Sequence, residues 1–242
     1  MQKNKTILII PDIHGRDFWK DGVEQRLPGE KIIFLGDYTD PYPHEGIKHD
    51  VVPGLLYEIL KVPDTILLLG NHDLSYIFPE VAPAVRKDPN PERRYDLKQF
   101  FKENWNRFGL VYQEDNVVFS HSGFVEGSYQ NFRGKKYENP SEIAEVFQRN
   151  WENKNIQFLR DELFRISWYR GGYDEYGSCV WADVREHIQQ NPQSEKYYQV
   201  FGHTMLKKGH IIVKPNFAML DCQRPVRMTF NDSYEESDFV VL

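Results

Sequence analysis

The stretch TILIIPDIHG, residues 6–15, passes from a run of aliphatic residues directly to an aspartate and a histidine. The same order returns in KIIFLGDYTD, residues 31–40, and in TILLLGNHD, residues 65–73. Short, continuously apolar runs are typical of strands buried on both faces, in a sheet that helices cover. Segment 51–60 has the apolar spacing of a helix, so we expect an α/β sheet with polar residues at the strand ends.

The remaining chain predicts a second sheet and further helices. Helical patterns lie at 17–26, 95–108 and about 139–164, and segments 84–108 and 128–165 are expected to be insertions that cover one edge of the site. Further strands are expected at 117–119, 197–201, 211–213, 217–220, 226–230 and 239–242. The fold class predicted is α/β, a four-layer sandwich of two mixed β-sheets flanked by helices. Since no linker rich in glycine, serine or proline divides it, residues 1–242 are expected to form a single domain.

Composition restricts the partners and the compartment. The 242 residues carry a net charge of −6, which argues against a nucleic-acid partner because such proteins usually present a basic face. The apolar run at 6–10 is too short for a signal peptide, and no run approaches the ~18 apolar residues of a membrane span. Cys179 and Cys222 show no paired spacing. We therefore expect a cytoplasmic protein with two reduced thiols and no membrane partner.

Five short blocks carry the chemistry of the chain. They are PDIHG at 11–15, GDYTD at 36–40, GNHD at 70–73, HSG at 121–123 and GHT at 202–204. Asp, Asn and His offer oxygen and nitrogen donors, and the adjacent glycines permit sharp turns and close approach of a substrate. A site that hydrolyses phosphate esters with two metals needs such donors around ions ~3.5–4 Å apart, with a shared carboxylate. Each block alone is typical of a turn, but the ordered set predicts a binuclear site.

In this order the blocks resemble the calcineurin-like metallophosphoesterase superfamily. The resemblance is to its phosphoprotein-phosphatase branch, which includes bacterial and phage serine/threonine phosphatases and symmetrical dinucleoside tetraphosphatases. The family pattern is GDxHG, GDxVDRG, GNHE, HxG and GH, and the resemblance spans about residues 6–222. It implies hydrolysis of a phosphate ester, foremost a phosphomonoester on a protein or small molecule, by attack of metal-bound hydroxide. It also implies two divalent metal ions, with manganese as the first candidate and iron, zinc or magnesium as alternatives.

The resemblance also implies a role for each matching residue. The metal ligands would be Asp12, His14, Asp37, Asn71, His121 and His203, with Asp37 shared by both ions. His72 would protonate the leaving oxygen, and Asp40 would hydrogen-bond to His72 and keep it charged and aimed. Arg170, in the fragment WYR, would clamp the phosphate. Trp181 belongs to a W-x-D fragment that either lies near the site, as in the family, or packs in the core.

Two departures from the family pattern concern the substrate. Pro41 stands where the family has an arginine, and Asp73 replaces the usual glutamate. One phosphate clamp is therefore either absent or supplied by another residue, with the candidates Arg93, Arg94 and Arg133. The other histidines have no motif: His44 is expected in an exposed loop, and the surface or capping candidates are His49, His187 and His210.

Other functions remain alternatives at this stage. A dinucleoside polyphosphate or nucleotide hydrolase is the nearest. A non-catalytic interaction module on the same fold is another, although every ligand position is intact. A nuclease is disfavoured because Met205 replaces the second histidine of the GHxH fragment. The sequence predicts no oligomeric state.

Overall fold

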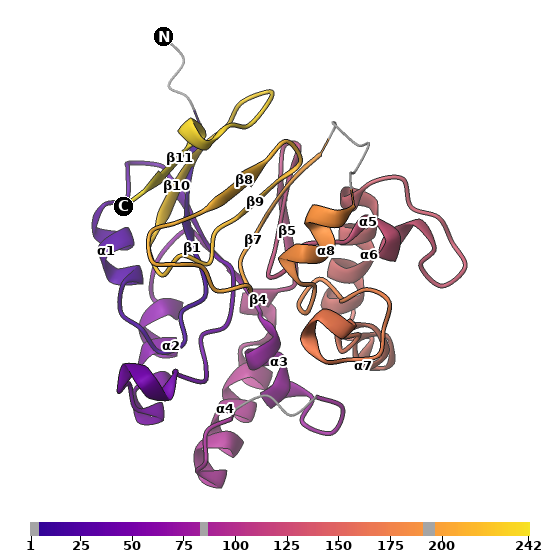
Figure 1. Ribbon diagram of the computed structural model, residues 1–242. Helices are drawn as coiled ribbons and strands as arrows, with labels where there is room; N and C mark the ends of the chain where they lie inside the picture. Colours follow the sequence, from indigo (N-terminus) through magenta and orange to yellow (C-terminus); the bar gives the residue numbers. More distant parts are fainter. Residues whose placement is uncertain (1–4, 83–86, 191–196) are drawn as a thin grey trace.

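The structure is a computed structural model that describes residues 5–82, 87–190 and 197–242, and its centre is two mixed β-sheets (Figure 1). The first sheet has the strand order β11 (Phe239–Val241), β10 (Val226–Thr229), β1 (Thr6–Ile10), β2 (Lys31–Phe34), β3 (Thr65–Leu68) and β4 (Phe108–Gly109). The second has the order β5 (Val111–Glu114), β6 (Val117–Ser120), β7 (Tyr198–Phe201), β9 (Phe217–Met219) and β8 (Ile212–Lys214). Strands β1 to β4 are parallel in the first sheet, with β10 and β11 antiparallel at one edge. In the second sheet β6, β7 and β9 are parallel, with β5 and β8 antiparallel at the two edges.

Burial on both faces explains the continuous apolar strands. Ile7 and Ile9 of β1 pack toward the second sheet, in a cluster that includes Phe119 and Val200. Leu8 and Ile10 of the same strand pack toward the helices instead. Because side chains alternate along a strand, both sets must be apolar when both faces are covered.

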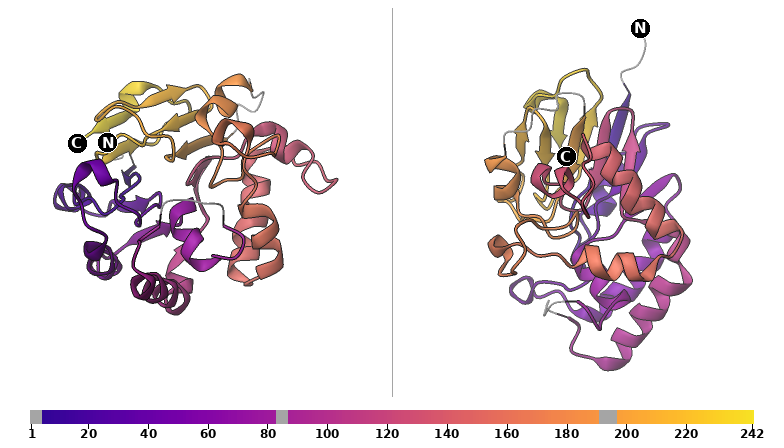
Figure 2. Two further views of the ribbon diagram at one scale, coloured as in Figure 1. Left: turned by 60° about the horizontal axis from the view of Figure 1, so that its bottom comes forward. Right: turned by 90° about the vertical axis from the view of Figure 1, so that its right-hand side faces the viewer.

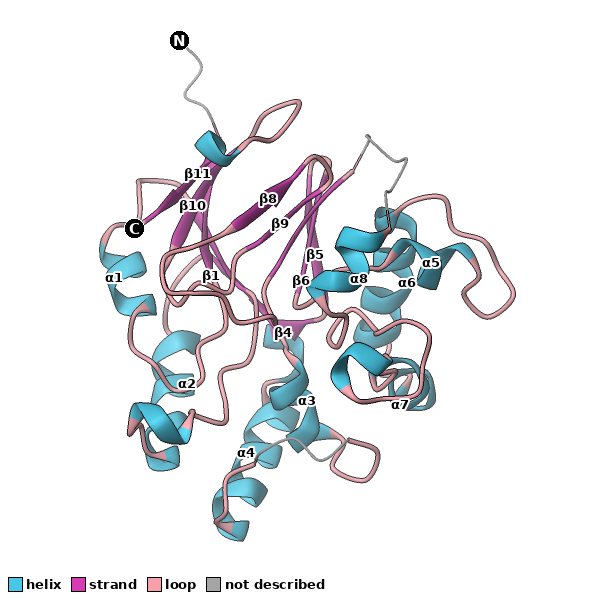
Figure 3. Ribbon diagram, in the orientation of Figure 1, coloured by secondary structure: helices cyan, strands magenta, loops and turns pink. Residues whose placement is uncertain are grey.

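Helices surround the sheets. Figures 1 and 3 show α1 (Trp19–Glu24) and α2 (Val52–Leu60) on one side of the strands. The opposite side, also seen in Figure 2, holds α5 (Glu126–Gln130), α6 (Pro140–Glu152), α7 (Ile156–Leu163) and α8 (Val184–Gln189). Two more helices, α3 (Asn71–Ile77) and α4 (Pro91–Glu103), follow β3. None of the described helices is long and apolar enough to span a membrane.

The predicted sandwich of two mixed sheets with helices is confirmed, and some of its details differ. The last two strands were expected in the second sheet, but β10 pairs antiparallel with β1 and brings β11 into the first sheet. Strands β4 and β5 were not predicted, because residues 108–114 come directly after a segment with a helical pattern and show no strand pattern of their own. That residues 1–242 form one domain stays a prediction.

Helices occur in both segments that were expected to be insertions, with different bounds, and their being insertions stays a prediction. Helix α4 begins at Pro91, because the Asn90 side chain accepts hydrogen bonds from the backbone of the first turn. The pattern at 139–164 divides into α6 and α7, and Asn155 caps the second helix. The indole rings of Trp105 and Trp151 stack at 3.8 Å and join the two insertions, so these aromatic residues form core. Residues 84–86 of the first insertion lie outside the described ranges.

Candidate metal centre and active site

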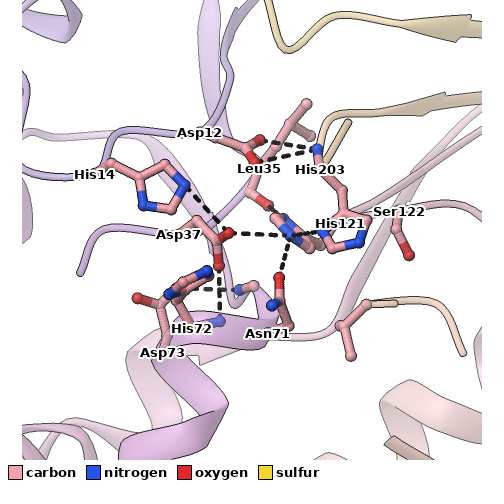
Figure 4. A network of polar contacts seen from close by, with 12 residues as sticks. Asp12, His14, Leu35, Asp37, Asn71, His72, Asp73, His121, Ser122 and His203 are labelled. Carbon is pink, nitrogen blue, oxygen red and sulfur yellow. Dashed lines mark hydrogen bonds and ion pairs between the residues drawn. The ribbon is translucent and has the colours of Figure 1, made fainter. Parts of the chain in front are cut away.

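The predicted ligands meet where the strands of both sheets end (Figure 4). Asp12 follows β1, Asp37 follows β2 and Asn71 begins α3 just after β3. From the second sheet, His121 follows β6 and His203 follows β7. All five side chains lie in one cluster although they are far apart in the sequence, because the ends of parallel strands share one edge of a sheet.

The loops that hold these side chains have unusual backbone conformations. His14, Asp37, Asp40 and His203 all have positive φ values, of 46°, 51°, 58° and 69°. Non-glycine residues rarely adopt this left-handed region, and those that do are frequent at functional sites. The side chains therefore point inward at the cost of local backbone strain.

Asp37 lies between two groups of potential metal donors. One group is His14, Asp37 and His72, and the other is Asp37, His121 and His203. Oδ2 of Asp37 is 3.5 Å from Nε2 of His14 and 3.5 Å from Nε2 of His121. A carboxylate shared by two donor sets is the arrangement that a two-metal site requires.

The ring orientations leave lone pairs that face the centre. Nδ1 of His14 donates to the carbonyl oxygen of Thr39 at 2.9 Å, and Nδ1 of His121 donates to that of Leu35 at 2.8 Å. Metal-binding histidines commonly use their second ring nitrogen in this way. Nε2 of His121 then faces the centre, 3.1 Å from both Oδ1 of Asn71 and Nδ1 of His203. Three potential metal donors therefore meet at this point.

The electrostatics of the cluster also fit a cation. Burial raises the pKa of Asp37 well above its ordinary value, and burial lowers the pKa values of His14 and His203 far below theirs. The centre thus combines a buried carboxylate with neutral imidazoles, and the charge of nearby His72 offsets only part of the desolvation of that carboxylate. Nε2 of His203 is also buried without a hydrogen-bond partner within the described ranges.

Two glycines make room for the carboxylates. A Cβ atom on Gly70 would overlap the carboxylate of Asp37, and one on Gly202 would overlap Oδ1 of Asp12. The backbone N–H of His203, next to Gly202, lies 3.1 Å from both carboxylate oxygens of Asp12. The glycine in each of these blocks therefore has a steric purpose.

His72 and Asp40 form a hydrogen-bonded pair beside the donor cluster. Nδ1 of His72 is 2.7 Å from Oδ2 of Asp40, whose side chain is buried. Burial alone would lower the pKa of His72, but the charge of Asp37 and the hydrogen bond to Asp40 outweigh it and raise that pKa. The backbone N–H of His72 donates to Oδ1 of Asp37 at 2.9 Å, which fixes this pair relative to the donors.

Asp73 joins the second and third blocks. Its Oδ1 accepts from the backbone N–H groups of Tyr38 and Thr39 at 3.0 and 3.2 Å, and its Oδ2 accepts from that of Gly70 at 3.1 Å. The shorter acid thus ties the loop after β2 to the start of α3.

Arg170 contacts the loop that holds His203. Its Nη2 donates to Oγ1 of Thr204 at 2.6 Å. Its Nε is 2.8 Å from Oδ2 of Asp183, off the direction of the N–H bond, so this contact is an ion pair rather than a hydrogen bond. Trp181 packs edge-on against the ring of His203 at 5.8 Å, which places the W-x-D fragment at the site.

The candidates for the missing arginine have other partners. Arg133 pairs with Glu162 and stacks on Phe158, both on α7. Arg93 pairs with the carboxylate of Asp88, and Arg94 donates to the carbonyl oxygen of that residue.

Sequence patterns missed two residues near the site and misplaced one histidine. Asp221 follows β9 as Asp12 follows β1, and its buried Oδ1 has no hydrogen-bond partner among the described residues. Tyr42 packs edge-on against His14 at 4.6 Å. The expectation of a surface or capping position for His187 was wrong, because its ring is buried and stacks on Phe201 at 4.5 Å. Only Asp221 had a signal in the sequence, an aspartate after an apolar run.

Comparison with known proteins agrees with this geometry. The family model described as calcineurin-like phosphoesterase matches residues 5–207. A cold-active protein-tyrosine phosphatase of a psychrophile, Shewanella sp., has a similar structure with a TM-score of 0.55 and 12% identity, covering 99% of this chain and 81% of that one. Another cold-active protein tyrosine phosphatase structure has a TM-score of 0.57 and 13% identity, covering 94% and 74%. These likenesses show a shared fold. A search of curated proteins gave no match.

Proposed function

Because the chain belongs to the calcineurin-like phosphoesterase family, whose members hydrolyse phosphate esters, we propose that it is a phosphomonoesterase with two divalent cations. The substrate would be a phosphorylated protein or a small molecule. The position of Asp37 supports this proposal most, since its Oδ2 lies at equal distance from imidazole nitrogens of two donor groups. A cytoplasmic location stays a prediction.

The donor set suggests how the cations would be held. Asp12, His14 and Asp37 would bind one, and the second would use Asp37 together with Asn71, His121 and His203. A mixture of imidazole nitrogen with carboxylate and amide oxygen suits manganese, iron or zinc, and we propose manganese. When bound, the cations would activate a water molecule for attack and stabilise the charge that develops on the phosphate.

The proton for the leaving group would come from His72. Its pKa is raised, so the imidazolium form is available near neutral pH, and Asp40 orients the ring through Nδ1. Nε2 is then the atom that delivers the proton to the leaving oxygen. General acids of this kind contribute roughly 10²–10⁴-fold to the rate.

Arg170 would bind the phosphate oxygens, the role that the resemblance implies for it. Its ion pair with Asp183 and its hydrogen bond to Thr204 restrict the guanidinium beside His203. A planar guanidinium can hold two phosphate oxygens at once, which a more mobile ammonium group cannot do.

The direct test is hydrolysis of an aryl phosphate by protein stripped of metal and then supplied with Mn²⁺. Asp37→Asn keeps the size of the side chain and removes the shared charge, and Asp232→Asn makes the same change at an exposed position. We expect turnover that depends on Mn²⁺, is lost in Asp37→Asn and persists in Asp232→Asn. Absence of turnover on aryl phosphates and phosphopeptides, together with cleavage of diadenosine tetraphosphate, would favour a dinucleotide hydrolase instead.

A further inference from the structure

We propose that Tyr76 is a positioning residue for the general acid, in that its hydroxyl holds the Asp40 carboxylate in the orientation that supports His72. This inference rests on the proposed role of the His72 and Asp40 pair. Neither the family pattern nor the sequence motifs include Tyr76, and its role follows from a chain of hydrogen bonds between α3 and the segment before α4.

One helical turn holds both oxygens of Asp40. His72 and Tyr76 stand four residues apart on α3, so their side chains lie on the same face of the helix. Nδ1 of His72 is 2.7 Å from Oδ2 of Asp40, and the hydroxyl of Tyr76 donates to Oδ1 of the same carboxylate at 2.5 Å. The carboxylate is therefore gripped from both sides by a single rigid element.

Such a grip matters because the Asp40 carboxylate does not have a sharply preferred orientation of its own. Rotation about the bond to a carboxylate is broad and roughly two-fold, so packing and hydrogen bonds set the plane of the group. Asp40 also has a left-handed backbone, with a φ of 58°, and precedes Pro41. A hydrogen bond to Oδ1 fixes the plane in which Oδ2 meets the imidazole of His72.

The hydroxyl of Tyr76 has only one direction in which to donate. Its oxygen accepts a hydrogen bond from the backbone N–H of Asp88 at 2.9 Å, so its own proton is directed to Asp40. The side chain of Asp88 is in turn fixed by Arg93, whose Nε and Nη2 lie 2.6 and 3.1 Å from its carboxylate oxygens. Tyr76 and Asp88 are both buried, so the hydrogen bonds between them and to Asp40 are shielded from water.

The test compares two substrates of the same enzyme in the variant Tyr76→Phe. p-Nitrophenyl phosphate has a leaving group that needs little protonation, whereas an alkyl phosphate needs a general acid. We expect kcat for the alkyl phosphate to fall roughly tenfold, as part of the 10²–10⁴-fold that a general acid supplies. Turnover of p-nitrophenyl phosphate and the content of bound Mn²⁺ should change little.

A matched control and a double variant separate positioning from general damage. Tyr198→Phe removes a hydroxyl from another buried tyrosine, at the opposite end of β7 from His203, and should leave both rates unchanged. In a His72→Asn background, Tyr76→Phe should cause no further loss, because it acts through the missing imidazole.

An equal loss with both substrates, or the same loss in the His72→Asn background, would overturn the inference and leave the phosphoesterase assignment intact. If the unaltered enzyme with Mn²⁺ hydrolysed neither substrate, the proposed function would fail, and the inference with it.

Discussion

Acid should destabilise this fold in part through the buried histidine His187. Its ring lies between α8 and the second sheet, stacked on Phe201, and its Nε2 donates to the carbonyl oxygen of Ser122 at 2.9 Å. Burial lowers the pKa of His187 from 6.5 to about 4, since a charged imidazolium would lose its hydration there. The segment that carries Ser122 also carries the candidate ligand His121.

The sign and size of the effect follow from proton linkage. Between pH 6.5 and about 4, the unfolded chain binds a proton at His187 and the folded protein does not. The contribution to stability is therefore complete above pH 6.5 and is lost as the pH falls toward 4. Each pH unit of this gap is worth ~1.36 kcal/mol, so His187 should lower the free energy of unfolding by roughly 2 kcal/mol at pH 5 and roughly 3 kcal/mol at pH 4.

The assay is urea unfolding at several pH values from 7 to 4.5. His187→Gln keeps an N–H donor but cannot gain a proton, and His210→Gln makes the same change at an exposed position. Between pH 7 and 5, the unaltered protein and His210→Gln should lose roughly 2 kcal/mol more than His187→Gln does. Equal losses in all three proteins would show that burial of His187 does not govern the acid response.

Three further substitutions test the site and the core. Gly202→Ala should lower turnover at least ~100-fold, as expected when Asp12 is displaced by about 1 Å, and should reduce Mn²⁺ content measured by mass spectrometry. Arg170→Lys should raise KM about tenfold with a smaller change in kcat, because lysine cannot hold Asp183 and two phosphate oxygens together; an unchanged KM would remove Arg170 from phosphate binding. Trp151→Ala should cost ~3–5 kcal/mol in urea unfolding, since its fully buried ring stacks on a second indole; a cost below ~1 kcal/mol would contradict its place in the core.

The features that the sequence predicted best are those that a local residue pattern determines. Strands β1, β2 and β3 were expected because burial on both faces requires apolar residues throughout, and that requirement is visible in a single chain segment. The ligand blocks could also be predicted, because each combines a turn-forming glycine with a metal-donor side chain at the end of a strand. The partner of a strand is not a local property, which is why β10 was placed in the wrong sheet.

Residues whose role depends on tertiary contacts had no such signal. No sequence pattern singled out Tyr76, and only the fold shows that its hydroxyl meets Asp40. Histidine is a polar residue type, so the sequence indicated a surface position for His187. Its burial follows from the packing of α8 on the second sheet. Arg133 was a candidate for the phosphate clamp until the fold paired it with Glu162 on α7.

The number of cations per chain tests the two-metal proposal most directly. Metal-stripped protein would be titrated with Mn²⁺ while bound metal is counted by mass spectrometry and turnover of p-nitrophenyl phosphate is followed in the same samples. We expect two Mn²⁺ ions per chain, full turnover only when both are bound, and loss of at least one ion in Asp37→Asn. Full turnover with a single ion, or with none, would contradict a centre in which Asp37 is shared by two cations.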